Sequence, residues 1–256
     1  MTSPLTDLDI DAAARHLLAL HQTSSTGPRL PPALRPRRPD EGWRVQQRLS
    51  ALRATPVLGW KSALPRQDRW GAGAIHTVIP SGGRTRAPRG PNGMPRIEPE
   101  LAFAFAHGLP ARPEPYTASD VDAAVTGVQL AVEVLGCRYA DPAHASGPEL
   151  MADHIWNQAL VLGSRVAATA KQTGMALTLS IPGQSDRAVD GRHPDGDPRL
   201  PLYWLAEFLR TQDLGLAPGQ VVITGSFAGA IEVPFGQQVT LRYGELGEIS
   251  FQLDRP

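Results

Sequence analysis

Bulky and small side chains alternate strictly from Ile97 to Ala106, and this alternation predicts a β-strand. Because successive strand side chains point to opposite faces, one face carries Ile97, Pro99, Leu101, Phe103 and Phe105, and the other carries Glu98, Glu100, Ala102, Ala104 and Ala106. We expect the bulky face to pack in the core. The alanines leave space beside the two glutamates, which predicts that the second face forms the wall of a pocket. A charged edge strand that discourages aggregation is the alternative interpretation.

Pro99 constrains where this strand can lie in its sheet. Proline has no backbone N–H to donate, so we expect an edge, a mouth or a bulge rather than the middle of a ladder. Edges and bulges are positions at which binding sites are built.

The remaining pattern predicts helices first and strands afterwards. Apolar residues recur at helical spacing over 8–23, over a segment that begins at an Asp40 cap and ends before Pro56, and over 202–211. Ser119 and Asp122 predict a capping box for a short helix through residue 124, and 148–152 predicts a helical turn. Strands are expected at 57–64, 75–79, 125–134, 159–163, 175–181, 221–223, 239–243 and 248–253. The segment 183–198 is expected to be a polar loop, long enough for a lid or rim.

This order of elements indicates the fold class. Because the strands do not alternate regularly with helices, the sequence favours an α+β fold with a mixed, strand-rich body over a doubly wound sheet. We expect an N-terminal helical region over residues 1–56 and the strand-rich body over residues 57–256.

Composition narrows the classes of function. The 256 residues carry a formal net charge of +0, which argues against nucleic acid or an anionic membrane surface as the partner. No long apolar segment and no secretory pattern is present, so we expect a cytoplasmic enzyme. With only Cys137, one chain can form neither an internal disulfide nor a thiolate metal site.

Lysine is rare in this chain. Of the 25 basic residues two are lysines, Lys61 and Lys171, which leaves 23 arginines. A buried lysine can lose its proton whereas arginine cannot, so Lys61, within the apolar run 57–64, is a candidate for proton transfer. The alternative is a lysine that reaches the surface along its aliphatic stem.

A third carboxylate, Glu133, lies in the apolar run 125–134. Burying it is costly unless it is paired or binds a cation. Pairing with Arg138 is one possibility. The other is a metal site shared with Glu98 and Glu100, because three hard oxygen ligands suit Mg²⁺ or Mn²⁺ and leave coordination positions for water or a bidentate 2-oxo acid.

A buried strand at 221–223 ends in Thr224-Gly225-Ser226. Small hydroxyl residues around a glycine can present backbone N–H groups and hydroxyls to an anion, so these three residues are candidates for substrate binding. Many ordinary turns have the same composition.

Taken in order, these motifs resemble the 2-keto-4-pentenoate hydratase branch of the fumarylacetoacetate hydrolase superfamily. The matching segments are Gly59-Trp60-Lys61, Ile97-Glu98-Pro99-Glu100-Leu101-Ala102-Phe103, Ala131-Val132-Glu133-Val134, Arg138-Tyr139, Ala152-Asp153, Trp204-Leu205-Ala206, the run from Gly219 to Ser226, and Leu246-Gly247. The resemblance implies a β-roll or barrel body, a divalent metal held by the three glutamates, and a 2-oxo acid substrate. It also implies that Lys61 acts near the reacting carbon.

The resemblance extends to the segment around Asp153, with departures. Where the family usually reads Ala-Asp-Asn-Ala-Ser, this chain reads Ala152-Asp153-His154-Ile155-Trp156. We expect Asp153 and His154 to be catalytic and Arg138 and Trp156 to contact substrate. The exchanges predict a rebuilt pocket around the distal end of the substrate, one that prefers a bulkier or more apolar tail.

The resulting hypothesis is a metal-dependent lyase that adds water to a 2-hydroxyalka-2,4-dienoate and gives a 4-hydroxy-2-oxo acid. A 2-oxo acid decarboxylase or an acylpyruvate-type C–C hydrolase would use the same chemistry. A non-catalytic partner subunit is the alternative outside enzymes. The expected partners are this small acid and further copies of the chain in a homo-oligomer.

Overall fold

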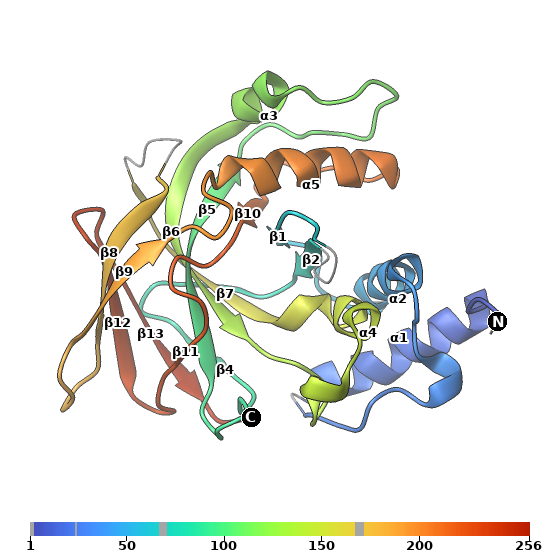
Figure 1. Ribbon diagram of the computed structural model, residues 1–256, viewed down its shortest axis with the longest axis horizontal. Coiled ribbons are helices and arrows are strands. Elements are labelled where there is room, and N and C mark those ends of the chain that lie inside the picture. Colours follow the sequence, from blue (N-terminus) through green and yellow to red (C-terminus); the bar gives the residue numbers. More distant parts are fainter. Residues whose placement is uncertain (1–2, 24, 67–70, 167–171) are drawn as a thin grey trace.

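The computed structural model describes residues 3–23, 25–66, 71–166 and 172–256. Two sheets form its body, and a group of helices lies on the side opposite the smaller sheet (Figure 1). The larger sheet has the order β2-β1-β10-β5-β6-β7-β3, with β11 also paired to β5. Its strands are β1 (Gly59–Ser62), β2 (Ala72–Ile75), β3 (Val78–Pro80), β5 (Arg96–Phe105), β6 (Val125–Leu135), β7 (Asn157–Val166), β10 (Val221–Ile223) and β11 (Ile231–Glu232).

The smaller sheet closes one side of the main core. Its order is β4-β13-β12-β8-β9, from strands β4 (Arg84–Arg86), β8 (Gly174–Ser180), β9 (Arg187–Arg192), β12 (Gln238–Tyr243) and β13 (Glu248–Asp254). Apolar residues that alternate along β12 and β13 join those of β5 and β6 in one buried cluster. The strand β9 lies inside 183–198, which was wrongly predicted to be a loop throughout; its side chains are mostly exposed and lack the apolar alternation that marks a strand.

The strand β5 has neighbours on both sides, so it is not an edge strand, but Pro99 itself lies outside the ladder on one of these sides, as its missing N–H requires. Along one side it pairs with β6 over its whole length. On the other side it pairs with β10 at Ala102–Ala104 and with β11 at Arg96–Ile97, and Pro99 lies between these two segments. There the Pro99 carbonyl accepts the N–H of Phe227 at 2.9 Å. Because a strand residue directs its nitrogen and its carbonyl to the same side, the proline nitrogen faces this interruption of the ladder.

The two faces of β5 are both packed. The bulky side chains lie in the main core as predicted. Ala102 and Ala104 pack on the opposite side in a smaller cluster with Ile75, Leu160 and Ile223, so the expected open space beside them is filled. The glutamates therefore emerge at the end of a closed apolar layer.

The N-terminal helices form a lobe with its own core. The helices α1 (Asp7–Gln22) and α2 (Pro39–Leu52) pack with the short η1 (Pro32–Leu34) and with α4 (Gly147–Ala152) from the body. Their cluster also contains Cys137, Tyr139 and Ala152, so residues on both sides of the predicted boundary at 56 share it. Figure 1 shows α1, α2 and α4 side by side. The boundary itself stays a prediction.

Two helices, α2 and α3, begin at other residues than the sequence predicted. Thr117, rather than Ser119, forms the capping box of α3 (Ala118–Ala124), with Asp120. The helix α2 begins at Pro39, one residue before Asp40, because proline fits the first turn, where no N–H is needed. The last helix, α5 (Arg199–Thr211), packs on the main core through Leu202, Leu205 and Leu209. Among the described residues, no helix is long and apolar enough to cross a membrane.

Candidate active site

Three glutamates converge between neighbouring strands of the larger sheet. Glu98 and Glu100 share one face of β5, and Glu133 lies directly across from Glu98 on β6. One carboxylate oxygen of each lies within 4.8 Å of the others. The two-residue spacing on β5 and the register with β6 produce this arrangement. The sequence-predicted ligand set is thus brought together.

This glutamate triad is largely withdrawn from solvent. Glu133 is fully buried, Glu100 is 2% exposed and Glu98 is half-buried. Burial, together with the charges of Glu133 and Glu98, raises the pKa of Glu100 well above its ordinary value. Burial also raises the pKa of Glu98, although the charge of Lys61 opposes the shift. When all three glutamates are ionised, their negative charge therefore exceeds the single positive charge of Lys61 beside them.

Lys61 and Asn157 donate hydrogen bonds to Glu133. Lys61 Nζ on β1 donates to Oε2 at 2.7 Å, and Asn157 Nδ2 at the start of β7 donates to Oε1 at 2.8 Å. The pairing that the sequence left open, with Arg138, is not formed. Lys61 passes close to Gly73 on β2, where a Cβ would lie 2.9 Å from Lys61 Cγ. A glycine at that position therefore makes room for the lysine stem.

The ligand set of the triad fits a hard divalent cation. Carboxylate oxygens suit Mg²⁺ or Mn²⁺ better than the softer metals that prefer thiolates and imidazoles. Lys61 balances one of the three negative charges at most, and a divalent ion would balance the rest. Glu98, Glu100 and Glu133 are the residues that would hold it.

The segment Thr224-Gly225-Ser226, directly after β10, contacts the triad at Glu100. The Gly225 N–H donates to Glu100 Oε2 at 2.7 Å, so this donor binds a carboxylate of the chain itself. Gly225 has φ 139°, and a Cβ there would lie 2.9 Å from Pro194 Cγ, so only glycine fits. The Ser226 hydroxyl donates to the Gly229 carbonyl. Thr224 is buried beside the ring of His193. The expected donors to an external anion are thus largely used internally.

Asp153, predicted to be catalytic, anchors the chain instead of facing the triad. Its Oδ2 accepts the backbone N–H of Arg138 at 2.6 Å, and its Oδ1 lies 2.8 Å from His21 Nε2. The residue is fully buried. It ties the segment after β6 to α1 and to the turn that follows α4.

That turn, η3 (His154–Trp156), is strained. His154, Ile155 and Trp156 have φ values of 56°, 51° and 66° in succession. Residues other than glycine adopt this left-handed backbone conformation at a cost of order 1–3 kcal/mol each. The conformation directs His154 and Trp156 into different cavities. His154 is buried, with Nε2 3.1 Å from Ser50 Oγ.

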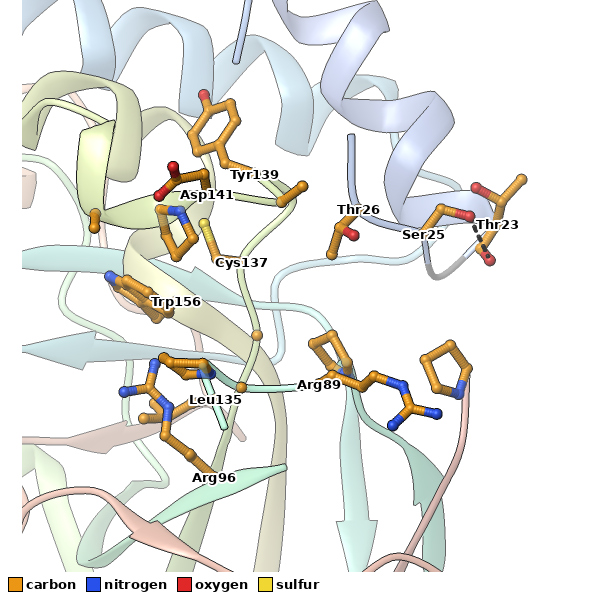
Figure 2. A pocket seen from close by; sticks show the side chains of 18 residues that line it. Thr23, Ser25, Thr26, Arg89, Arg96, Leu135, Cys137, Tyr139, Asp141 and Trp156 are labelled. Carbon is orange, nitrogen blue, oxygen red and sulfur yellow. Dashed lines mark hydrogen bonds between the residues drawn. The ribbon is translucent and has the colours of Figure 1, made fainter. Parts of the chain in front are cut away.

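Trp156 lies in the larger cavity, which has a volume of about 850 Å³ (Figure 2). The cavity lies between the helical lobe and the body; Thr23, Ser25 and Thr26 line one side, and Trp156 packs under Arg96 with 4.9 Å from guanidinium carbon to ring centre. No triad residue lines it. Its size alone therefore does not mark it as the place of chemistry.

The smaller cavity, about 280 Å³, adjoins the triad through Asn157, which both lines it and donates to Glu133. Arg138 and His154 line it, together with His21, Arg53, Ala74, His76, Thr77, Thr85, Arg86 and Gln158. This polar lining does not support the expected preference for a more apolar tail.

Sequence reasoning missed Asn157, Arg53 and His76 as site residues. Asn157 directly follows the motif Ala152–Trp156 and has no spacing that marks it as a partner of Glu133. Arg53 caps the C-terminal end of α2, and in the sequence it resembles any solvent-facing arginine. Lys171, the second lysine, lies outside the described residues.

Comparison with known proteins agrees with this architecture. A curated relative from Escherichia coli, a 2-oxo-hept-4-ene-1,7-dioate hydratase, is 28% identical over 174 residues, 61% of each chain. A 2-keto-4-pentenoate hydratase from Burkholderia vietnamiensis is 27% identical over 158 residues, 61% of this chain and 59% of that one. The matched part therefore spans less than two thirds of either relative.

Solved structures show the same fold. The 4-oxalocrotonate decarboxylase from Pseudomonas putida G7, complexed with magnesium and adipate, superposes with a TM-score of 0.78 at 20% identity, covering 98% of this chain and 100% of that one. The predicted strand-rich α+β fold is confirmed. The profile of the fumarylacetoacetate (FAA) hydrolase C-terminal family matches residues 55–253, and this chain belongs to that family.

Proposed function

We propose that the chain is a divalent-metal-dependent lyase that adds water to a 2-hydroxyalka-2,4-dienoate and yields a 4-hydroxy-2-oxo acid. The observation that carries the proposal is the convergence of Glu98, Glu100 and Glu133 within 4.8 Å, with Lys61 Nζ 2.7 Å from Glu133. The names of the two curated relatives, both hydratases of small unsaturated 2-oxo acids, support the reaction class.

The three glutamates would hold Mg²⁺ or Mn²⁺, with Asn157 fixing the orientation of Glu133. Bound there, the ion would supply Lewis-acid stabilisation of negative charge on the C2 oxygen of the substrate. Burial of the triad excludes bulk water, so charges at this site act in a low-dielectric environment.

Lys61 is the residue of this chain that moves the proton. Its Nζ is already within hydrogen-bond distance of the triad, and its stem lies between β2 and the triad. In the hydration, the dienol loses its enol proton and gains one at C5 as it becomes the 2-oxo-3-enoic acid, and water then adds its hydroxyl at C4 and its proton at C3. Lys61 Nζ takes up the enol proton and donates a proton to C5, so that its own charge is restored.

Decarboxylation is the second candidate. The superposition on a 4-oxalocrotonate decarboxylase covers nearly the whole of both chains, and loss of CO₂ from a 2-oxo acid passes through the same enolate. An acylpyruvate-type hydrolysis would pass through an enolate of the same kind. A non-catalytic partner subunit is disfavoured because its triad and lysine would have no use.

A direct assay separates these reactions. Protein loaded with Mg²⁺ is incubated with 2-hydroxypenta-2,4-dienoate, and proton NMR follows formation of 4-hydroxy-2-oxopentanoate. In parallel, 2-oxohex-3-enedioate and an acylpyruvate are tested for release of CO₂ or of a free carboxylic acid. Hydration lost in Glu100→Gln supports the proposal. Release of CO₂ or acid without hydration replaces it, and inactivity on every substrate with normal Mg²⁺ binding favours the partner subunit.

A further inference from the structure

Along its face of the larger sheet, the glutamate triad is closed off on one side. Ala102 follows Glu100 on that face of β5, since side chains two residues apart on a strand point the same way. It packs in a small apolar cluster with Ile75, Leu160 and Ile223. The tail of a ligand bound at the triad therefore finds no space in this direction.

The opposite direction along the same face leads to Arg96 and Leu135. These two residues are paired across β5 and β6, as Glu98 and Glu133 are two positions further along. They therefore stand next to the triad, at roughly 7 Å along the strands. Burial raises the pKa of Glu98, and the charge of Arg96 is one of those that oppose the rise, which agrees with this closeness. Arg96 and Leu135 both line the larger cavity.

The chain's own side chains occupy both flanks of the triad. Lys61 donates to Glu133 from β1, and Asn157 donates to it from β7, on the other side of β6. Asn157 also lines the smaller cavity, so a ligand would have to displace this amide to pass there from the triad. The direction toward Arg96 and Leu135 is thus the open one.

The larger cavity offers space and a broad apolar wall. Its volume of about 850 Å³ lies in the range of pockets that hold drug-sized ligands, so a short-chain acid would leave most of it empty. Figure 2 shows the indole of Trp156 at the same end of the cavity as Arg96 and Leu135. Pro88 and Pro142 add further apolar surface.

The charged side chains of this cavity already have partners. The Arg96 guanidinium packs on the Trp156 ring, beside the negatively charged triad. Arg89 Nη1 donates to the Gly93 carbonyl at 3.3 Å, and Asp141 adds a negative charge to the lining. The two arginines thus face Asp141 and the triad, and this balance favours an uncharged ligand tail.

We propose that the distal part of the substrate extends over Arg96 and Leu135 into the larger cavity, and that the chain prefers 2-oxo acids with an uncharged aromatic tail packed against Trp156. The inference rests on the proposed function, because it takes the carboxylate and the C2 oxygen of the substrate to be held at the triad. An aromatic ring suits this wall, since aromatic pairs gain from offset or edge-to-face contacts beyond the area that they bury.

Calorimetry with matched acids tests the inference. Protein saturated with Mg²⁺ is titrated with 2-oxo-4-phenylbutanoate, 2-oxo-5-phenylpentanoate and 2-oxo-6-phenylhexanoate, and with 2-oxobutanoate, 2-oxopentanoate and 2-oxohexanoate. We expect one phenyl acid to bind at least 10-fold more tightly than the acid of equal chain length without the ring, about 1.4 kcal/mol.

A pair of tryptophan variants locates the ring. In Trp156→Leu the ratio of the two affinities falls toward one. Trp204→Leu is the matched control, because Trp204 stacks on Phe208 on α5 and does not line the cavity; this variant keeps the ratio. In the wild-type protein, which needs no variant to fold, nuclear Overhauser effects should connect the phenyl protons of the ligand with the Trp156 indole.

The outcomes distinguish this inference from the function on which it rests. Equal binding of phenyl and unsubstituted acids overturns the aromatic-tail site and leaves the proposed function standing. A preference for the phenyl acid that persists in Trp156→Leu, without contacts to the indole in the wild type, places the ring elsewhere and also overturns it. Binding of no 2-oxo acid by the Mg²⁺-loaded protein removes the proposed function and this inference with it.

Discussion

Lys61 Nζ on β1 and Glu133 Oε2 on β6 lie 2.7 Å apart although two strands, β10 and β5, separate their strands in the sheet. Burial lowers the pKa of Lys61, but the charges of Glu133, Glu98 and Glu100 together raise it above its ordinary value. Without a metal the lysine is therefore an ammonium group held by the triad. A divalent ion would compete for the same carboxylates and release the amine to exchange protons.

Substitution of Lys61 tests its role in proton transfer. Lys61→Ala should lower kcat by about 10²–10⁴-fold while Mg²⁺ affinity, measured by calorimetry, stays within a factor of a few. Lys61→Arg should not restore kcat, because a guanidinium stays charged. If Lys61→Arg has near-full activity, the lysine serves as a cationic anchor and the proton carrier is another group.

Glu100→Gln should abolish measurable Mg²⁺ binding and also stabilise the metal-free protein. The substitution removes a buried charge whose pKa the site raises, and it keeps an oxygen for the Gly225 N–H. Calorimetry and thermal unfolding of metal-free protein check both parts. Glu245→Gln, on an exposed turn, serves as the control. Unchanged Mg²⁺ affinity in Glu100→Gln would show that the triad is not the metal site.

Asn157→Leu should weaken Mg²⁺ binding by about 10–100-fold. Leucine has a similar volume but cannot donate to Glu133, which leaves the orientation of that carboxylate unfixed. The measurement is a Mg²⁺ titration, with Asn92→Leu on the surface as the matched control. An affinity equal to that of the wild type would mean that Lys61 alone positions Glu133.

Acid should destabilise the protein through His76. Its pKa falls to about 4 in the folded state, from 6.5, first by burial and then by the charge of Arg53. The unfolded chain therefore binds a proton below pH 6.5 while the folded protein does not. The resulting loss of stability grows as pH falls from 6.5 to 4 and reaches about 3 kcal/mol.

Urea unfolding between pH 7 and pH 4 measures this contribution as a difference between variants. His76→Asn should lose less stability than the wild type over that interval, whereas His144→Asn, with a largely exposed ring, should follow the wild type. Parallel curves for wild type and His76→Asn would contradict the assignment.

The sequence carried enough information to place the triad but not its surroundings. Glu98 and Glu100 are two residues apart on a strongly alternating strand, so their shared face follows from strand geometry alone. The cost of burying Glu133 and the resemblance to a family both suggested its partnership with these glutamates, but the register of β5 and β6 that places Glu133 opposite Glu98 is not encoded in the local pattern. Pro99 is accommodated inside the sheet because its nitrogen faces the gap between β10 and β11. This gap is formed by segments far away in the sequence, so the local pattern around Pro99 does not predict it.

The second cavity was beyond local reasoning for a similar reason. Arg53, His76 and Arg138 are far apart in the sequence and meet only because α2, β2 and the segment after β6 pack together. The left-handed turn at His154–Trp156 separates two neighbouring residues into different cavities, against the ordinary preference of their side chains. Sequence reasoning therefore grouped His154 with Trp156 in one pocket.

The central claim is that the triad and Lys61 together form and protonate the enolate of a 2-oxo acid, whichever bond changes afterwards. Exchange of the C3 protons of 2-oxopentanoate for deuterium in D₂O, followed by proton NMR, reports this step directly. The account predicts exchange that requires Mg²⁺ or Mn²⁺ and is lost with EDTA, in Glu100→Gln and in Lys61→Ala. Exchange no faster than in buffer, or equally fast in EDTA, would contradict it.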